Sequence, residues 1–536
     1  MVQQAISLAS LPGHYPSFLS NTATEDHLLL NGVVPGSLRD ISGFTAHHRN
    51  VLADAIISDL EDWHAPSSAF REAEKLRSTG TYAVVTGQQA GIATGPLYTL
   101  YKAVGTIRAA GELSRAYPEH QFVPVFWIEG DDHDFDEART ISVMERSGDV
   151  RTVRYDDADS RRRHVGDRIV SREGLETFMA EIREVLGETD FTPEVLTALE
   201  EAYQGNNRTL GDGFARFMYA LAGDLPLVLV SSRNTQLKAL AASVFATEAS
   251  NPDRLFNALQ SRTEELSSQA LPTPITPKPG ALFVTHDGER KSLDIEENGY
   301  RIKGTEEVLS REEAAATATK HPELFSPNVA LRPVVQDTIL PTAIYLGGPS
   351  EIAYLNQLHS VYPLFGIEQP AIAPRPFVTL VEPKAARVLE NSSVSIEQLF
   401  DTGFDPATFL MDEEKEKEIE GILAAAHKSV ESGFEMFADI TNDIDKSLDK
   451  ALGAGMHKAG KELENFGSRL KAALKRRNET EINRLNGARA LLLPSGSLQE
   501  RTLNPLYIAN KYGMDRLRTL LQEIDCTAGA MQMLLL

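Results

Sequence analysis

Short apolar runs alternate with helix-like patterns along the chain between about residues 80 and 380. Runs of this length, bounded by polar turns, are typical of buried strands, and helical segments between them are typical of a parallel sheet covered by helices. The pattern therefore predicts an α/β fold with a parallel sheet. The expected strands are Tyr82–Thr86, Phe122–Ile128, Leu225–Ser231, Ala281–Thr285, Ala343–Leu346 and Ala371–Ala373.

Two stretches within this region are too long to be simple crossovers between neighbouring strands. Residues 140–215 contain charged turns and a helical pattern of their own. Residues 270–325 begin with a proline-rich segment and continue with hairpin-like turns at Thr285–Gly288 and Glu297–Gly299. We interpret both stretches as insertions into a core domain that spans residues 1–390.

Residues 391–536 are predicted to form a second region, an α-helical hairpin followed by a closing segment. Apolar residues recur there at spacings of three and four, as in a coiled-coil seam. We expect Gly453–Gly455 to break the first helix and Met456 to begin the second. The hairpin either packs only on its own body or pairs two chains, and the pattern leaves both roles open. The seams comprise Ile419, Ile422, Ala426, Val430, Phe434, Phe437, Ile440, Ile444, Leu448 and Leu452, then Met456, Leu463, Phe466, Leu470, Leu474, Ile482 and Leu485.

Composition and charge exclude several classes of protein. A length of 536 residues suggests three domains, or two of which one is large. The net charge of −23 repels phosphate backbones, so we expect no nucleic-acid partner. One cysteine, Cys526, excludes a disulfide within the chain and a thiolate zinc cluster. No basic segment precedes an apolar one at the N-terminus and no run of 18 apolar residues occurs, so we expect no membrane contact and a cytoplasmic location.

The first candidate functional segment follows the strand expected at Tyr82–Thr86. A loop punctuated by glycine, Gly87–Gly95, leads to Pro96, which suits the first turn of a helix. Amide groups at such a helix start can bind an anion, although the spacing matches neither the dinucleotide-binding nor the Walker pattern. The alternative is a tight turn that requires glycine. The substrate-binding residues predicted here are Gln88, Gln89, Thr94 and Tyr98.

The second candidate segment follows the strand expected at Phe122–Ile128 and is strongly acidic. Carboxylates crowd the stretch Glu129–Glu137, and their repulsion calls for protonation or for a cation, such as a metal ion or the ammonium group of an amino acid. A histidine among them suits a general base. The alternative is a solvated loop that caps the next helix. We predict that Trp127, Glu129 and Asp131 bind substrate and that Asp132, His133 and Asp134 are catalytic.

The third candidate segment leads from Arg332 to a Gly-Gly-Pro turn and a helix with Glu351 in its first turn, where a carboxylate is favoured. Arg332 suits a bidentate contact with a substrate carboxylate, and the alternative is a structural pair with Asp337. The carboxyl ends of parallel strands meet at one edge of a sheet, so we expect the three segments to form one pocket of an enzyme. The substrate-binding residues predicted here are Arg332, Gln336, Gly348 and Glu351.

Three strings in these segments resemble the family of cysteine ligases of bacillithiol biosynthesis, BshC: TGQQAGIATGPLYTLYK, PVFWIEGDDHDFDE and LRPVVQDTILPTAIYLGGPSEIAY. The likeness continues through Pro374 and Arg375 and covers nearly the whole chain. It implies a Rossmann-like core similar to class I aminoacyl-tRNA synthetases, two connecting insertions, and a C-terminal coiled coil that pairs subunits into a homodimer. The His-Ile-Gly-His and Lys-Met-Ser-Lys-Ser signatures of those synthetases are absent.

The resemblance also implies an activity: a ligase that adds cysteine to glucosamine malate in the last step of bacillithiol biosynthesis. ATP or ADP is the expected cofactor, with ATP as the source of energy, because joining a free carboxylate to an amine in water is unfavourable. No metal is predicted. The late segment resembles the part of the family that contacts an adenine nucleotide, which implies nucleotide binding by Arg501, Asn504, Tyr507, Asn510 and Tyr512. The alternative for this segment is an aromatic-rich closing helix.

These expectations combine into one hypothesis of mechanism. Glucosamine malate binds through its carboxylates to Arg332 and the loop Gly87–Gly95, and the ammonium group of cysteine lies against the acidic segment. The sugar amine then attacks the activated carboxyl group of cysteine while His133 or Asp134 accepts a proton. Two functions of other classes remain as alternatives: a non-catalytic nucleotide or thiol sensor, and a metal-dependent hydrolase built on Asp131–Asp136.

Overall fold

The computed structural model of the chain describes residues 5–7, 11, 27–29, 32–157, 159–410, 413–526 and 530–536. It contains two compact units. The first comprises Met1–Pro383 with Leu491–Leu536, and the second comprises Lys384–Ala490. The predicted division at residue 391 differs from this grouping, because the closing segment that follows the hairpin belongs to the first compact unit.

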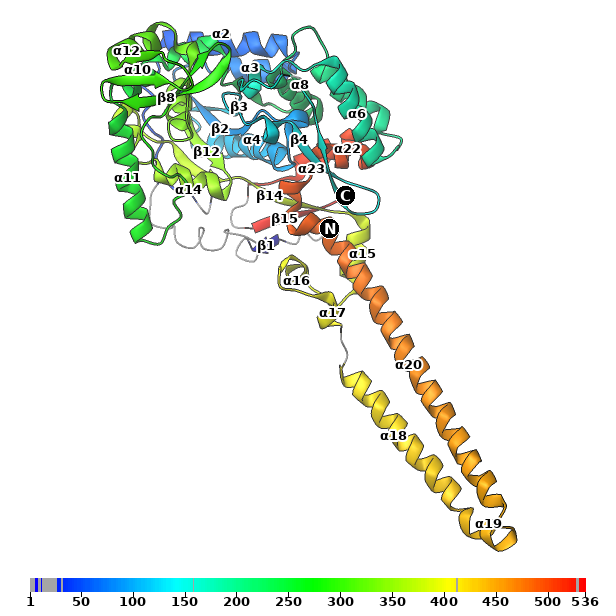
Figure 1. Cartoon of the computed structure of the whole chain (residues 1–536). Helices are drawn as coiled ribbons and strands as arrows, with labels where there is room; N and C mark the ends of the chain where they lie inside the picture. Colours follow the sequence, from blue (N-terminus) through cyan, green and yellow to red (C-terminus); the bar gives the residue numbers. More distant parts are fainter. Residues whose placement is uncertain are drawn as a thin grey trace. The chain divides into compact units, whose positions relative to one another are not determined.

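A parallel sheet of five strands forms the centre of the first unit in the described residues (Figure 1). Numbered along the chain, its strands lie in the order 5-4-1-2-3, which is the doubly wound order of Rossmann-like folds. The predicted α/β fold is confirmed. The strands, in spatial order, are β13 (Ala371–Pro374), β12 (Thr342–Gly347), β2 (Thr81–Gln89), β3 (Gln121–Glu129) and β6 (Val228–Ser231).

The fourth expected strand, Ala281–Thr285, was wrongly placed in this sheet. It forms β7 (Leu282–His286), which pairs antiparallel with its neighbours in a separate sheet. An apolar run shows that a strand is buried but does not show which sheet it joins.

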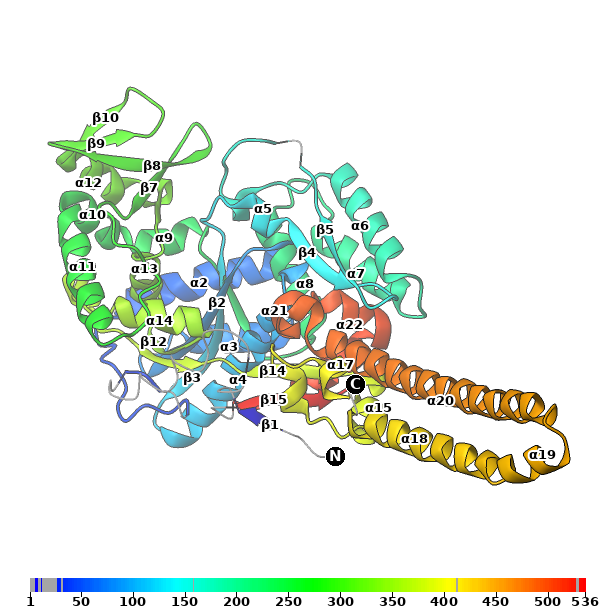
Figure 2. The same ribbon diagram turned by 60° about the horizontal axis from the view of Figure 1, so that its bottom comes forward.

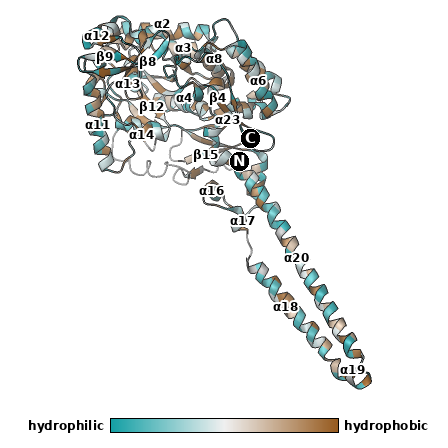
Figure 3. Cartoon of the chain, viewed as in Figure 1, coloured by the Kyte–Doolittle hydropathy of each residue, from teal (hydrophilic) through white to brown (hydrophobic). Residues whose placement is uncertain are grey.

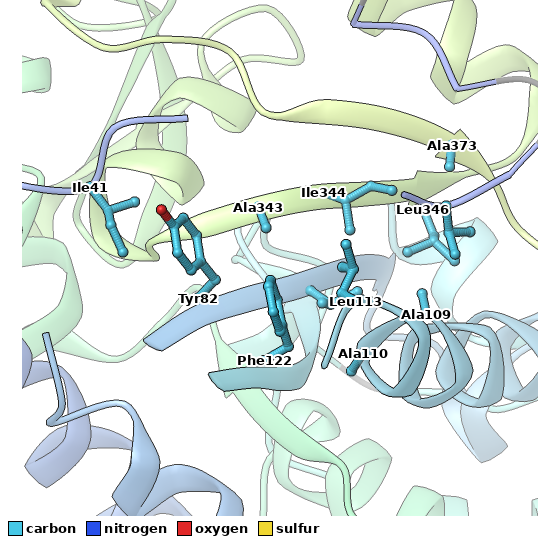
Figure 4. Close-up of a cluster of buried hydrophobic side chains, with 12 residues drawn as sticks. Ile41, Tyr82, Ala109, Ala110, Leu113, Phe122, Ala343, Ile344, Leu346 and Ala373 are labelled. Atoms are coloured by element: carbon cyan, nitrogen blue, oxygen red, sulfur yellow. The ribbon is translucent and has the colours of Figure 1, made fainter. Parts of the chain in front are cut away.

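The core lies between the central sheet and helix α4 (Tyr98–Ala116). Tyr82 and Val84 of β2 and Ile344 of β12 belong to one cluster of buried residues that also includes Ala109 and Leu113 of this helix (Figure 4). Strand β2 is buried along its first seven residues, as is usual for a parallel strand covered on both faces. Helices α2 (Ala46–Asp62) and α3 (Ser67–Lys75) pack against β6 and the rest of the sheet (Figure 1).

The two predicted insertions interrupt the order of the central strands. Between β3 and β6 the chain forms the hairpin β4–β5 and three longer helices, and between β6 and β12 it forms helices and an antiparallel sheet of order β10-β9-β8-β7-β11. Figures 1 and 2 show these two parts on either side of the central strands. The elements are α5 (Phe135–Ala138), β4 (Thr140–Met144), β5 (Val150–Arg154), α6 (Arg172–Leu186), α7 (Thr192–Tyr203), α8 (Leu210–Ala222), α9 (Thr235–Leu240), α10 (Ala242–Ser250), α11 (Pro252–Ser268), β8 (Glu289–Glu296), β9 (Gly299–Ile302), β10 (Val308–Ser310), α12 (Arg311–Lys320) and β11 (Phe325–Pro327).

A further sheet joins distant parts of the sequence. Strand β15 (Ala530–Leu535) pairs parallel with β14 (Phe377–Val381) and antiparallel with β1 (Ala5–Ser7). Sequence reasoning did not predict this sheet. The helices that complete the first unit are α13 (Arg332–Ile339), α14 (Pro349–Gln357), α21 (Gln499–Thr502), α22 (Pro505–Tyr512) and α23 (Met514–Glu523).

The second unit contains the helical hairpin. Helix α18 (Glu413–Glu435) and helix α20 (Leu448–Leu492) run antiparallel, with the short α19 (Ala438–Ile444) between them. Along both helices, apolar residues recur among hydrophilic ones (Figure 3). Three short helices lie before α18: α15 (Pro383–Asn391), α16 (Ile396–Phe400) and α17 (Pro406–Phe409).

The predicted break at Gly453–Gly455 is wrong. The chain turns earlier, around α19, and α20 continues through both glycines. A Cβ on Gly455 would lie 3.0 Å from the ring of Phe434, and one on Gly467 would lie 2.4 Å from Leu423. These glycines therefore let the two helices approach each other closely and do not end a helix.

Candidate active site

A cavity opens at the carboxyl ends of β2 and β12, the point at which the strand order of the central sheet reverses. This is where open α/β sheets bind their ligands. Its volume is about 270 Å³, space for roughly nine water molecules and hence for a small metabolite. The residues that line this first cavity are Gly87, Gln88, Gln89, Tyr98, Lys102, Trp127, Glu129, Arg332, Tyr345, Gly348, Ser350, Glu351, Tyr354, Arg375 and Arg501.

The pairing of β2 with β3 aligns the ends of two predicted segments. The register places Gly87 beside Trp127 and Gln89 beside Glu129, so both polar strand ends reach the same edge. A Cβ on Gly87 would lie 2.9 Å from the carbonyl oxygen of Trp127. Glycine is therefore required at Gly87 by close packing within the sheet, in addition to any role in the loop.

A buried ion pair forms one wall of the first cavity. Lys102 Nζ lies 2.6 Å from Glu351 Oε2 and also donates to the carbonyl of Gly87 at 2.8 Å and to Gln88 Oε1 at 3.2 Å. Burial lowers the pKa of Lys102, and Glu351 opposes that effect. Glu351 also accepts hydrogen bonds from the Gly348 amide and the Tyr345 hydroxyl. Glu351, the carboxylate predicted in the first turn of α14, thus caps this helix and forms an ion pair with Lys102.

Arg332 begins α13 and projects into the first cavity. Its guanidinium donates to Gln336 Oε1 at 3.0 Å and to the Tyr354 hydroxyl at 2.9 Å. Gln336 is fully buried and orients Arg332, whereas a direct contact with substrate was predicted. The alternative pairing with Asp337 does not form, since Asp337 accepts from Thr342 and Tyr362 instead.

Glu129 occupies the end of β3 and lies between two cavities. Its carboxylate accepts from Trp127 Nε1 at 3.1 Å, from the Asp131 amide at 2.8 Å and from Ser232 Oγ at 3.2 Å. Burial raises the pKa of Glu129 and the Asp131 carboxylate raises it further, whereas Arg332 lowers it. The fixed orientation of this carboxylate suits it to bind an ammonium group or to accept a proton.

A second cavity, of about 380 Å³, shares Glu129 and Arg332 with the first. Most of the acidic segment reaches this cavity and not the first one. The residues that line the second cavity are Glu129, Asp131, Asp132, His133, Phe283, Arg290, Pro327, Asn328, Val329 and Arg332.

Asp131 is neutralised by the protein itself. Its Oδ1 lies 2.6 Å from Arg233 Nη1 and 2.8 Å from Lys238 Nζ. Burial alone would raise the pKa of Asp131, but Lys238 and Arg233 hold it well below its ordinary value. The structure thus places Asp131 in a buried ion cluster, where the predicted contact with a substrate ammonium would compete with two cations.

His133 lies between two arginines at the second cavity. Its Nε2 is 2.6 Å from Arg162 Nη2, and its Nδ1 is 3.0 Å from Arg290 Nη1. Burial lowers the pKa of His133 and both guanidinium groups lower it further, so the ring is neutral near pH 7. A neutral imidazole can accept a proton.

The other two predicted catalytic carboxylates differ in position. Asp132 lines the second cavity and accepts from the His133 amide at 2.6 Å and from Gln89 Nε2 at 3.3 Å. Asp134 instead caps α5, because its Oδ1 accepts from the Glu137 amide. Asp134 therefore has the helix-capping role that was the alternative prediction for the acidic segment.

The loop Gly87–Gly95 offers fewer amides than predicted. The amides of Ala90, Ala93 and Gly95 donate to Glu129 O, the Tyr203 hydroxyl and Ile92 O. Thr94, predicted to bind substrate, is fully buried and has a positive φ of 67°, next to Ala93 at 49°. This part of the loop is a strained, internally bonded turn.

The residues proposed for nucleotide binding are dispersed. Arg501 lines the first cavity. The side-chain Nδ2 of Asn504 donates to the carbonyls of Ala93 and Gly95, so it fixes the strained loop. The Asn510 side chain bonds to Thr192 and Gly187. Tyr507 and Tyr512 both donate to Glu382, which Lys511 also contacts.

Five residues of the first cavity were not selected from the sequence: Lys102, Tyr345, Ser350, Tyr354 and Arg375. Three of them carried a usable signal. Lys102 follows Tyr98 by four positions and Tyr354 follows Glu351 by three, which places each on the same helix face as its predicted neighbour. Arg375 directly follows a central strand, as the predicted segments do.

No group of three or more His, Cys, Asp or Glu side chains gathers as metal ligands do, within the residues that the structure describes. Among those same residues, none of the helices is both long enough and apolar enough to cross a bilayer.

Comparison with known proteins decides the family. Residues 37–376 match the N-terminal Rossmann-like domain of bacillithiol biosynthesis BshC, and residues 378–536 match the C-terminal coiled-coil domain of BshC. The chain belongs to the BshC family. The predicted resemblance is confirmed.

Curated BshC relatives cover most of the chain. Proteins named "Putative cysteine ligase BshC" are 33% identical in Salinibacter ruber over 87% of this chain and 84% of the relative, and 32% identical in Chlorobaculum tepidum over the same shares. The Bacillus cytotoxicus protein of that name is 31% identical over 87% of each chain. The predicted enzyme class, a ligase, is thereby confirmed at the level of the BshC family.

Among solved structures, an arginyl-tRNA synthetase from Campylobacter jejuni, itself titled putative, is 12% identical over 83% of this chain and 93% of that chain. The TM-score is 0.26, too low to carry an argument about the fold.

Proposed function

We propose that this chain is a cytoplasmic cysteine ligase that joins cysteine to glucosamine malate with consumption of ATP, as the last step of bacillithiol biosynthesis. Membership of the BshC family supports the reaction class. The observation that carries the proposal is the convergence of three distant polar segments on the first cavity, at the switch point of the sheet. A site that joins two substrates needs this variety of polar groups in one place.

Glucosamine malate is assigned to the first cavity. Four cationic side chains face two carboxylates around it, which suits a substrate that carries carboxylates. Two hydrogen bonds fix the orientation of the Arg332 guanidinium, which presents a planar pair of donors to one substrate carboxylate. Gln88, Gln89 and Tyr98 orient the sugar. The phosphates of ATP are assigned to Arg501, which lines the same cavity with its guanidinium over the Tyr98 ring.

Bond formation joins the carboxyl carbon of cysteine to the amine nitrogen of the sugar. One carboxyl oxygen leaves with the activating group supplied by ATP, and the attacking amine loses a proton. The neutral ring of His133, supported by Asp132, accepts that proton. Asp134 is left out of this assignment because it caps a helix.

Reconstitution with purified components tests the proposal. The chain, L-cysteine, glucosamine malate and ATP are combined, and the cysteinyl amide product is measured by mass spectrometry. The proposal predicts product with ATP and none without it. Asp132→Ala and His133→Ala should each reduce turnover about 100-fold, a typical effect of losing a general base. His47→Ala, at an exposed position of α2, is the control. Ligand binding without any product would contradict the proposal and favour a sensor.

We further propose that the hairpin pairs two chains into a homodimer. Large apolar side chains are exposed along it in the described residues, with Ile422 and Phe466 each 61% exposed and Met436 79% exposed. Exposed apolar residues in a heptad-like pattern are stabilised by a partner helix. A hairpin that packed only on its own body would not need them.

A further inference from the structure

The second cavity has features that the proposed chemistry does not yet use. It forms where the end of β3 meets strands β7 and β8 of the second insertion and the segment before α13. The two insertions meet here as well, because the Arg290 amide donates to the carbonyl of Arg162 at 2.9 Å. Three parts of the chain distant in sequence thus enclose it.

Arg290 is fixed at the wall of this cavity. It is 8% exposed, its guanidinium stacks on the Phe283 ring at 3.6 Å, and it donates to Ser326 Oγ at 3.0 Å and to the carbonyl of Pro327 at 2.8 Å. These contacts use Nε and Nη2. The remaining nitrogen, Nη1, points toward His133.

The two arginines beside His133 compete for one acceptor. Both ring nitrogens face a guanidinium nitrogen, but a neutral imidazole has only one lone pair that can accept. One guanidinium N–H therefore faces a ring N–H. A carboxylate placed between Arg290, Arg162 and His133 would accept from the donors that the imidazole cannot satisfy.

Carboxylates lie next to the donors of Arg290, Arg162 and His133. Asp132 Oδ1 is 3.8 Å from Arg290 Nη1, and Glu129 lines the same cavity. Asp131 is already neutralised by Lys238 and Arg233, so Asp132 and Glu129 are the carboxylates placed to meet a substrate cation. An anion site and a cation site a few ångströms apart match the carboxylate and ammonium groups of an α-amino acid.

Part of the cavity wall is apolar. Phe283 and Pro327 contribute to it, together with Val329, which is 49% exposed. Such a surface accepts a short, weakly polar side chain such as a thiol.

We propose that the second cavity binds a small α-amino acid as a zwitterion, with its carboxylate on Arg290, its ammonium group facing Asp132 and Glu129, and its side chain against Val329. This inference rests on the proposed ligase function and assigns cysteine to a chamber separate from that of glucosamine malate. The two substrates then lie on either side of the shared wall formed by Glu129 and Arg332.

Filling the cavity tests the location. Val329→Trp places a large side chain there without removing a hydrogen bond of the wild-type side chain, and Val308→Trp, at a 48% exposed valine of β10, is the matched control. We expect Val329→Trp to raise the KM for cysteine about tenfold or more and to leave the KM for glucosamine malate within about twofold. Val308→Trp should change neither.

Ligand analogues test the chemistry independently of folding. Calorimetry compares L-cysteine with cysteamine, which lacks the carboxylate. Wild-type protein should bind cysteine at least about tenfold more tightly, and Arg290→Met should abolish that preference, because the carboxylate loses its charge-assisted partner. The ratio of the two affinities is taken within one protein, so partial unfolding does not alter it.

The outcomes separate the two proposals. Product formation by Val329→Trp with an unchanged KM for cysteine would overturn the second-cavity assignment and leave the ligase function standing. Failure of the wild-type chain both to bind cysteine and to form product would overturn both. A retained preference for cysteine in Arg290→Met would show that the carboxylate lies elsewhere.

Discussion

Arg332 is the residue whose geometry most constrains the proposed substrate. Gln336 and Tyr354 fix its guanidinium plane, so a lysine there would keep the charge and lose the planar pair of donors. We predict that Arg332→Lys raises the KM for glucosamine malate about 10- to 100-fold, as expected when a charge-assisted hydrogen bond is lost. Steady-state kinetics measures this. Arg172→Lys, at an 81% exposed side chain on α6, is the control. An unchanged KM in Arg332→Lys would contradict the assignment.

Glu248 makes the stability of the protein depend on pH. It is buried beside α12, and burial raises its pKa to about 8. The folded protein therefore retains a proton on Glu248 that the unfolded chain releases near pH 4.5, and stability falls as pH rises from about 4.5 to 8.

Replacing that carboxyl group with an amide removes this pH dependence. Glu248→Gln keeps the oxygen that accepts from the Ala281 amide. We predict that it matches the wild type at pH 5 and is more stable by at least about 1 kcal/mol at pH 9. Thermal denaturation across this range measures the difference, with Glu184→Gln on the exposed face of α6 as control. A difference that does not change with pH would refute the account.

At the scale of elements, Asn504 links the start of α22 to the loop after β2. Its Oδ1 caps α22 by accepting from the Leu506 amide, and its Nδ2 donates to Ala93 and Gly95. Asn504→Asp retains the cap but not the amide donor. We predict that Asn504→Asp and Asn504→Ala both lower kcat/KM about tenfold or more, because the strained loop next to Gln88 relaxes. Wild-type kinetics in Asn504→Asp would limit Asn504 to helix capping.

The hairpin gives an element-scale prediction of its own. Charges at Ile422 and Phe466 would repel across a paired seam, since both side chains are exposed in the single chain. We predict that the double variant Ile422→Glu and Phe466→Glu elutes as a monomer in size-exclusion chromatography with light scattering, while the wild type and the exposed Lys428→Glu remain dimers. A wild-type monomer at micromolar concentration would disprove the dimer.

Helices and strands could be predicted from the sequence where the local pattern of residues favours a single structure. The short, continuous apolar runs of β2, β3 and β12, bounded by polar turns, are typical of buried strands, and those strands were found. A glycine in the hairpin is compatible with two structures, the end of a helix or a close approach of two helices. Only the packing of Gly455 on Phe434 decides between them. The sheet of β1, β14 and β15 depends on pairing between opposite ends of the sequence, for which short strands carry no local signal.

At the scale of the whole molecule, strand order explains why the predicted segments meet. Crossovers in a doubly wound sheet bring the ends of β2 and β12 together, so Gln88, Glu129, Arg332 and Glu351 line one cavity although they are far apart in sequence. The fold does not place the whole acidic segment there, because β3 ends between two cavities. The ion pairs that occupy Asp131 come from residues after β6, which local sequence could not assign to it.

A crystal structure of the chain with glucosamine malate tests the central claim most directly, since that claim is a location. The account predicts electron density for the ligand in the first cavity, with a carboxylate on the guanidinium of Arg332 and the sugar beside Gln88. Density for the ligand at another site, with the first cavity empty in a crystal of active enzyme, would contradict it.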